Sequence, residues 1–214
     1  MSNVVVEITM SLDGYVAGPN PSLEDPLGQD GERLHEWALD AESWRELHGL
    51  EGGSKNVDSE LIQESFSGTG AVVMGRKMFS GGSGGWENDP RANGWWGDEP
   101  PFHTPVFVMT HHPRPPIDFP NGTSFRFVDG SPHEVLRLAQ EAADGRDVRL
   151  GGGPSTVRQF LQADLVDFMH LVIVPITLGR GVSLWEGADG IEDRFTVESV
   201  ASSSGLVHQL WNKN

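Results

Sequence analysis

The stretch 148-VRLGGGPSTVRQFLQ-162 combines residue types that can bind an anion. Its glycines follow an apolar run and precede the expected start of a helix. Glycine lets the backbone approach a phosphate, and the free N–H groups at a helix N-terminus point towards it. Any strand-to-helix turn can also use glycine, so the stretch alone leaves both interpretations open. The residues concerned are Gly151, Gly152, Gly153, Pro154, Ser155 and Thr156.

Two known phosphate-binding motifs do not fit this stretch. Thr156 stands where the last glycine of a G-x-G-x-x-G dinucleotide motif would be. The stretch also lacks the Gly-Lys-Ser/Thr ending that grips ATP phosphates and magnesium.

Two other expected strands end in similar chemistry. In 72-VVMGRKMF-79, Gly75 is followed at once by Arg76 and Lys77, and 106-VFVMTHHPRP-115 presents further polar groups. Because the carboxyl ends of parallel strands meet at one edge of a sheet, these groups are expected to lie together. Each basic group alone is also explained by a solvated surface. Their shared position favours a ligand such as the 2′-phosphate and pyrophosphate of NADPH. The groups of the second stretch are Thr110, His111 and Arg114.

Composition excludes several function classes. The 214 residues carry a net charge of −16 with only 15 Lys and Arg, which argues against nucleic acid and anionic membranes as partners. Cysteine is absent, so no disulfide or thiolate zinc site is expected. His111 and His112 are adjacent and would face opposite ways in a strand, so no metal site is expected either. Without a secretory or membrane-spanning segment, the expected location is cytoplasmic.

Strand-like and helix-like segments alternate along most of the chain, which predicts an α/β fold. We expect a single domain, residues 1–214, in three layers: about eight strands in a mainly parallel sheet, a C-terminal antiparallel hairpin, and helices on both faces. Long loops are expected at 11–31 and 80–103. Helices are expected at 32–48, 57–66 and 131–142 and from residue 154, and strands at 4–10, 71–74, 105–110, 124–128, 147–150, 168–176, 195–201 and 206–211.

Several motifs in order resemble the dihydrofolate reductase superfamily, and more closely the stand-alone relatives of the reductase domain of riboflavin biosynthesis. The resemblance runs from about Val4 to Trp211. The motifs are 9-TMSLDGYVAG-18, VVMGRKMF, VMTHHPRP, GGGPSTVRQFL and 164-DLVDFMHLVIVPITLGRGVSLW-185.

The resemblance implies an NADPH-dependent reductase and assigns roles by position. The backbone of Val16, Ala17 and Gly18 would hold the nicotinamide carboxamide. The strand end from Gly75 to Lys77 would meet phosphates, with Arg76 on the 2′-phosphate. Thr110, His111 and Arg114 would complete that pocket, and the glycine stretch would bind the pyrophosphate.

Hydride transfer needs proximity and a proton rather than a nucleophile. Asp58 lies close to where the resembling reductases keep a pocket carboxylate and is the candidate proton source. Glu60, Glu64 and water are alternatives, and Asp58 could instead cap the helix that follows.

The substrate is expected to be small, flat and heterocyclic, reduced at a C=N or C=O. The riboflavin-pathway reductases carry a lysine where this chain has Tyr15, and the segment after the 72–75 strand differs too, which argues against their pyrimidine as substrate. A pyrimidine reductase of riboflavin biosynthesis and a dihydrofolate reductase are the alternatives. The residues expected near substrate are Asp13, Tyr15, Trp86, Trp95 and Gly179.

Other interpretations stay open. An NADP-binding regulatory module would keep the phosphate contacts without turnover, and exposed tryptophans also suit a protein interface. Relatives of this kind commonly form homodimers, so a homodimer is expected.

Overall fold

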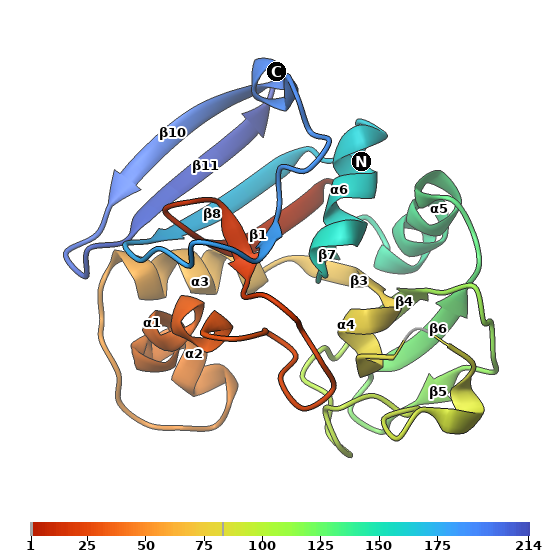
Figure 1. Cartoon of the computed structure of the whole chain (residues 1–214). Coiled ribbons are helices and arrows are strands. Elements are labelled where there is room, and N and C mark those ends of the chain that lie inside the picture. Colours follow the sequence, from red (N-terminus) through yellow and green to blue (C-terminus); the bar gives the residue numbers. More distant parts are fainter. Residues whose placement is uncertain (1, 83) are drawn as a thin grey trace. The chain divides into compact units, whose positions relative to one another are not determined.

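The computed structural model describes residues 2–82 and 84–214 (Figure 1). Contacts within the chain divide it into two compact units, each assembled from two separate segments. Unit 1 contains Met1–Val6 and Thr69–Asp167, and unit 2 contains Glu7–Gly68 and Phe168–Asn214. The single domain expected for residues 1–214 stays a prediction.

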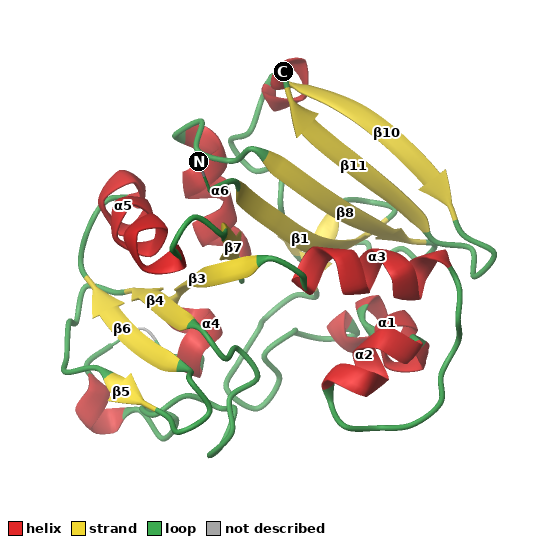
Figure 2. Cartoon of the chain, turned by 180° about the vertical axis from the view of Figure 1, so that it is seen from behind, coloured by secondary structure: helices red, strands yellow, loops and turns green. Residues whose placement is uncertain are grey.

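The main sheet has nine strands in the order β10-β11-β8-β1-β7-β3-β4-β6-β5 (Figure 2). The expected mainly parallel sheet with an antiparallel C-terminal hairpin is confirmed, with nine strands where about eight were expected. The additional edge strand, β5 (Ile117–Asp118), is antiparallel to β6. Two residues are too few to show a periodicity, so this strand could not be predicted from the residue pattern.

Unit 1 contains the parallel strands that position the glycine stretch. β3 pairs in parallel with β7 on one side and β4 on the other, and β4 pairs in parallel with β6. The carboxyl ends of these strands therefore lie at one edge of the sheet. The bounds are β1 (Val4–Ser11), which continues into unit 2, β3 (Thr69–Gly75), β4 (Pro105–Met109), β6 (Ser124–Val128) and β7 (Asp147–Leu150).

The helices of unit 1 are α4 (Arg76–Ser80), α5 (Pro132–Ala143) and α6 (Pro154–Gln162). The expected capping box of α5 is present: Ser131 Oγ accepts from the Glu134 N–H, and the Glu134 carboxylate accepts from the Ser131 N–H. α4 is an addition to the prediction, because no helix was expected between the strand at 71–74 and the loop at 80–103. Its Phe79 is fully buried among β3, β4 and β6 side chains, and that apolar packing stabilises so short a helix.

Unit 2 contains the antiparallel strands. β11 pairs with β8 and with β10, and a tight turn at 202–205 joins β10 to β11 as expected. Alternate residues of paired strands share a face, so His170 and His208 lie on the same face of the sheet. The bounds are β8 (Phe168–Val174), β10 (Phe195–Ala201) and β11 (Val207–Lys213).

The expected helix at 32–48 is wrong in one respect, since the segment is broken into three short pieces. Ala41 is extended and forms an isolated bridge with Ser54, and the Ser54 N–H donates to the Asp40 carbonyl. That pairing with a later segment overrides the helical periodicity. The pieces are η1 (Gly31–Leu34), α1 (Glu36–Asp40) and α2 (Glu42–Leu47). The helix expected at 57–66 is confirmed as α3 (Val57–Phe66).

The expected loop at 11–31 contains β2 (Tyr15–Ala17), which pairs with β9 (Val182–Ser183) in a separate two-stranded sheet. Short 3₁₀ helices follow at η2 (Trp86–Asn88) and η3 (Ile191–Arg194). Among the described residues, no helix combines the length and apolar character needed to span a membrane.

Candidate functional site

The three strand ends singled out in the sequence meet at one pocket of unit 1. The cavity has a volume of about 420 Å³ and receives residues from the ends of β3, β4 and β6 and from the first turn of α6. Polar side chains share its wall with two methionines and a proline. The lining residues are Gly75, Arg76, Lys77, Met78, Met109, Thr110, His111, Asp129, Gly130, Gly153, Pro154, Ser155, Thr156 and Gln159.

The α6 end of the pocket is shaped by small residues. Gly153 is the N-cap of α6, and Pro154 occupies the first turn as the sequence predicted. A Cβ at Gly75 would lie 2.5 Å from Thr156 Oγ1, so only glycine fits between β3 and α6 there. Gly151 and Gly152 lie behind the wall, where the Gly151 N–H donates to the Val73 carbonyl and the Gly152 carbonyl accepts from the Gly75 N–H.

The polar and charged groups of the pocket differ in their exposure and in whether they already form an ion pair or a hydrogen bond. Lys77 is exposed, and no ion pair involves it in the part of the chain that the structure describes. His111 is also exposed, and its Nδ1 lies 3.0 Å from Asp129 Oδ1. Thr110 is buried, and its Oγ1 accepts from the His112 N–H.

Arg76 lines the same pocket, but its guanidinium is engaged inside unit 1. The side chain is 7% exposed, Nη2 lies 2.5 Å from Asp89 Oδ2, and Nη1 donates to Ser80 Oγ. Ser80 Oγ donates to the same carboxylate oxygen, and the Arg91 N–H donates to the other. Burial raises the pKa of Asp89, but the hydrogen bonds from Ser80 and Arg76 and the nearby positive charge outweigh it and lower the pKa overall. The phosphate role of Arg76 stays a prediction, and this ion pair bears directly on it.

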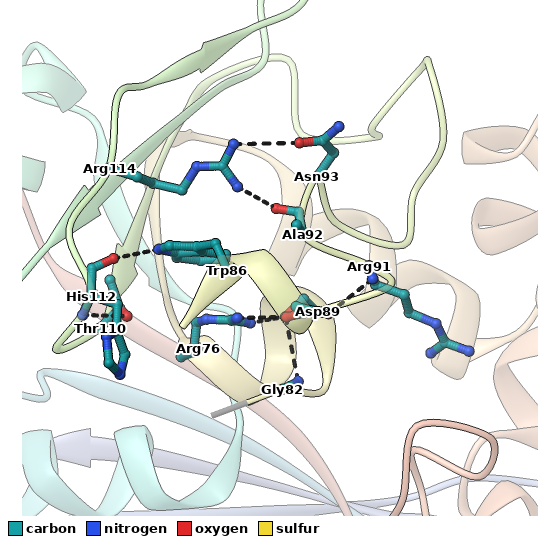
Figure 3. Close-up of polar contacts among 11 residues, drawn as sticks. Arg76, Gly82, Trp86, Asp89, Arg91, Ala92, Asn93, Thr110, His112 and Arg114 are labelled. Atoms are coloured by element: carbon teal, nitrogen blue, oxygen red, sulfur yellow. Dashed lines mark hydrogen bonds and ion pairs between the residues drawn. The ribbon is translucent and has the colours of Figure 1, made fainter. Parts of the chain in front are cut away.

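Trp86 lies between two guanidinium groups (Figure 3). Arg76 Cζ is 3.6 Å and Arg114 Cζ 4.8 Å from the ring centroid, and Trp86 Nε1 donates to the His112 carbonyl. Arg114 also donates to the Ala92 carbonyl and is absent from the residues that line the pocket. Trp95 is half-exposed, stacks on Trp96 and donates to the Met78 carbonyl. These contacts fasten the loop at 80–103 to the end of β4.

In unit 2 the opening segment is packed against two other stretches of backbone. The Gly18 N–H donates to the Leu27 carbonyl, and a Cβ at Gly18 would meet the Gln29 carbonyl at 1.9 Å. A Cβ at Gly181 would lie 2.1 Å from the Ala17 carbonyl oxygen. Val16 and Ala17 are buried in β2, beside the half-buried Tyr15.

Asp13 holds a neighbouring turn. Its carboxylate accepts from the N–H groups of Leu178 and Gly179 and from Ser11 Oγ. The hydrogen bond from Ser11 lowers the pKa of Asp13, and the two backbone N–H groups lower it further. Gly179 has a φ of 73°, which glycine adopts without strain. In the structure Asp13 therefore shapes the 178–181 turn; whether it also meets a substrate stays a prediction.

Asp58 is the end of a buried hydrogen-bonded chain in unit 2. Its Oδ1 accepts from His208 Nε2 at 2.8 Å, and His208 Nδ1 lies 2.8 Å from His170 Nε2. All three side chains are at most 5% exposed. Asp58 is not the helix cap, because Asn56 Oδ1 accepts the Ser59 N–H at the start of α3.

The pKa values of Asp58 and His170, the two ends of this hydrogen-bonded series, are both lowered. Burial raises the pKa of Asp58, but hydrogen bonds from Ser202, His208 and Ser204 outweigh it and lower the pKa overall. Burial, with the neighbouring His208, lowers the pKa of His170 to about 4. At neutral pH Asp58 is therefore an anion and His170 is neutral.

Asp58 also borders a second cavity of unit 2, of about 440 Å³. Its wall combines polar and acidic side chains with the indole of Trp37. The lining residues are Trp37, Asp40, Ala41, Ser54, Asn56, Asp58, Ser203 and Ser204. Glu60 and Glu64, the alternatives to Asp58, are exposed on α3 and do not border this cavity.

Sequence reasoning missed four residues of these sites: Asp89, Asp129, His170 and His208. Asp129 follows β6 directly, so the rule that pointed to the ends of β3 and β4 could have found it. His170 lies in the apolar strand β8, which is a signal for a buried polar group; His208 lies in β11 among other polar residues, where no such signal exists. In the described ranges, no group of three or more His, Cys, Asp or Glu side chains is arranged to hold a metal ion.

The family model of the RibD C-terminal domain matches residues 2–206. The chain belongs to this family. No curated protein matches it in sequence.

Solved structures share the fold of this RibD C-terminal domain. A candidate riboflavin biosynthesis protein of Shewanella sp. PV-4 is 22% identical with a TM-score of 0.58, and 99% of each chain is covered. The deaminase/reductase of Thermotoga maritima is 14% identical with a TM-score of 0.57, covering 100% of this chain and 57% of that one. Dihydrofolate reductase of Enterococcus faecalis complexed with NADP(H) is 13% identical with a TM-score of 0.51, covering 99% and 96%. The dihydrofolate-reductase-like fold expected from the motifs is thereby confirmed.

Proposed function

We propose that this RibD C-terminal domain protein is a reductase that uses NADPH to reduce a C=N or C=O bond of a small, flat heterocycle. The observation that carries the proposal is the unit 1 pocket, where three parallel strand ends and the start of α6 converge. This is the place where open parallel sheets bind nucleotides.

The residues present fit the phosphates of a dinucleotide. Among the described residues Lys77 has no ion-pair partner, and Ser155 and Thr156 offer hydroxyl donors. A Cβ at Gly153 would meet nothing within 4 Å, so the backbone there is open to a ligand. A bound reduced nicotinamide would supply the hydride. Backbone groups of Val16, Ala17 and Gly18 are proposed to hold its carboxamide, as the family resemblance implies.

Asp58 is proposed to bind the substrate rather than to protonate it. Its lowered pKa keeps it anionic at neutral pH, so it suits N–H donors of a heterocycle. The proton for the reduced atom would then come from water. A pyrimidine of riboflavin biosynthesis and dihydrofolate are the two named candidates, because structural neighbours carry those names. We further expect a homodimer.

The proposal is tested by titrating the purified protein with NADPH while following tryptophan fluorescence, and then adding pterins, pyrimidines and other conjugated imines or carbonyls. The expected results are saturable quenching and oxidation of NADPH by at least one acceptor class. Binding without oxidation by any acceptor would favour a regulatory module, and absence of binding would overturn the proposal.

A further inference from the structure

The charges around the unit 1 pocket nearly cancel. Of its lining residues, Arg76 and Lys77 are cations and Asp129 is an anion, and the imidazole of His111 lies beside Asp129. The resemblance to NADPH enzymes predicts instead a surplus of fixed positive charge for the 2′-phosphate. The contacts of each group decide how much of its charge a ligand would meet.

Arg76 contributes little net charge to the pocket. Its guanidinium is paired with Asp89, which is 3% exposed, and is covered by the Trp86 ring (Figure 3). Breaking that pair to bind a ligand would leave a buried carboxylate without its counter-charge, which is strongly unfavourable. Arg76 Nε has no hydrogen-bond partner among the described residues and can still donate. A phosphate oxygen bonded there would gain one hydrogen bond but little net charge attraction, because Asp89 offsets the charge of the guanidinium.

Asp129 places an exposed carboxylate in the wall of the pocket, beside the imidazole of His111. It follows the last residue of β6, is half-exposed, and shares the pocket wall with Lys77. A carboxylate at a strand end accepts hydrogen bonds from ribose hydroxyls and repels a phosphate on the same ribose. Lys77 acts in the opposite sense. The two exposed groups therefore compete in selecting the cofactor.

We propose that Asp129 is a specificity-determining residue that opposes Lys77, so that the reductase binds NADH as well as NADPH. This inference rests on the proposed function. Asp89 takes part indirectly, as the residue that keeps Arg76 from adding its charge.

The test measures dissociation constants for NADPH and NADH by fluorescence titration of the full chain. Wild-type protein should bind both, with constants within about tenfold of each other. Asp129→Asn should tighten NADPH by about three- to tenfold and leave NADH unchanged or slightly weaker. Lys77→Gln should weaken NADPH more than NADH.

Asp118→Asn is the matched control, because Asp118 is an exposed aspartate of unit 1 that pairs with Arg126 and does not line the pocket. It should change neither constant. A wild-type preference for NADPH above about 100-fold, or an Asp129→Asn variant with unchanged constants, would overturn the inference while the reductase proposal stands. If neither dinucleotide binds wild-type protein, the proposed function fails first.

The double variant Arg76→Met with Asp89→Asn separates the role of Arg76 without leaving a lone buried charge. If Arg76 only positions the loop, NADPH and NADH weaken by the same factor. A loss confined to NADPH would return the 2′-phosphate to Arg76 and contradict the inference.

Discussion

Each unit of the protein buries one carboxylate, and the two are balanced differently. Asp89 in unit 1 is paired with the guanidinium of Arg76, whereas Asp58 in unit 2 is bonded to the imidazole of His208. In both, burial raises the pKa and hydrogen-bond donors bring it below the usual value. The guanidinium stays charged at every relevant pH, but the second centre includes the imidazole of His170, whose pKa burial lowers to about 4.

The two buried centres differ in whether the uptake of a proton by an imidazole can change their charge. The ion pair between Arg76 and Asp89 holds part of the loop at 80–103 against α4, and its guanidinium does not lose its charge with pH. We therefore interpret it as a structural contact beside the pocket. The Asp58 chain ends in His170, whose pKa is lowered to about 4, and it borders a cavity. Protonation can therefore disturb the second centre and not the first.

The largest effect is expected from breaking the permanent pair. Arg76→Met leaves Asp89 buried without its counter-charge and should lower the free energy of unfolding by about 3–5 kcal/mol. Urea unfolding followed by tryptophan fluorescence measures it. Adding Asp89→Asn to the same variant should restore most of the loss, and a single variant within about 1 kcal/mol of wild type would show that the pair is not an anchor.

The titratable centre should make stability depend on pH. His170 binds a proton at about pH 6.5 when unfolded and only near pH 4 when folded, so acid favours the unfolded state. The free energy of unfolding should fall by up to about 3 kcal/mol between pH 6.5 and 4 through this group alone.

His170→Gln should flatten that part of the pH profile of urea unfolding. The exposed His133→Gln on α5 is the control and should leave the profile as in wild type. Profiles of equal slope for wild type and His170→Gln would show that His170 is not held neutral.

Loss of the Asp58 charge should also lower kcat/KM, because Asp58 is proposed to bind the substrate. Asp58→Asn keeps the shape of the side chain and removes the charge, so kcat/KM for an active acceptor should fall by about 100-fold or more. The dissociation constant of NADPH should stay unchanged, since the phosphate pocket lies wholly in unit 1. Near-normal kcat/KM would limit Asp58 to a structural role.

The smallest effect concerns one donor to Asp58. Ser204→Ala removes a hydrogen bond that lowers the pKa of Asp58, and should cost about 1 kcal/mol in the free energy of unfolding at neutral pH. The difference from wild type should shrink as the pH falls and Asp58 takes up a proton. A pH-independent difference would mean that Ser204 acts through the turn at 202–205 instead.

Features that depend on residues close together in the sequence were predicted correctly. The capping box at Ser131, the strand at 124–128 and the glycine stretch before α6 depend on neighbours within a few residues, and all were found. The break at Ala41 was not, because it depends on pairing with Ser54. The pairing of Asp58 with His208 spans 150 residues and leaves no local trace. The ends of β3 and β4 and the start of α6 were located, whereas Asp129 at the end of β6 was not. The engagement of Arg76 by Asp89 was also missed, because it depends on how a long loop folds back.

The central claim is that the pocket formed by the β3, β4 and β6 ends and α6 binds a dinucleotide. The most direct measurement compares NADPH binding to wild type and to Gly75→Ala, whose added Cβ would lie 2.5 Å from Thr156 Oγ1. Gly84→Ala, where a Cβ meets nothing within 4 Å, is the control. The account predicts at least about tenfold weaker binding for Gly75→Ala alone, with an unchanged fold. Equal binding by all three proteins would contradict it.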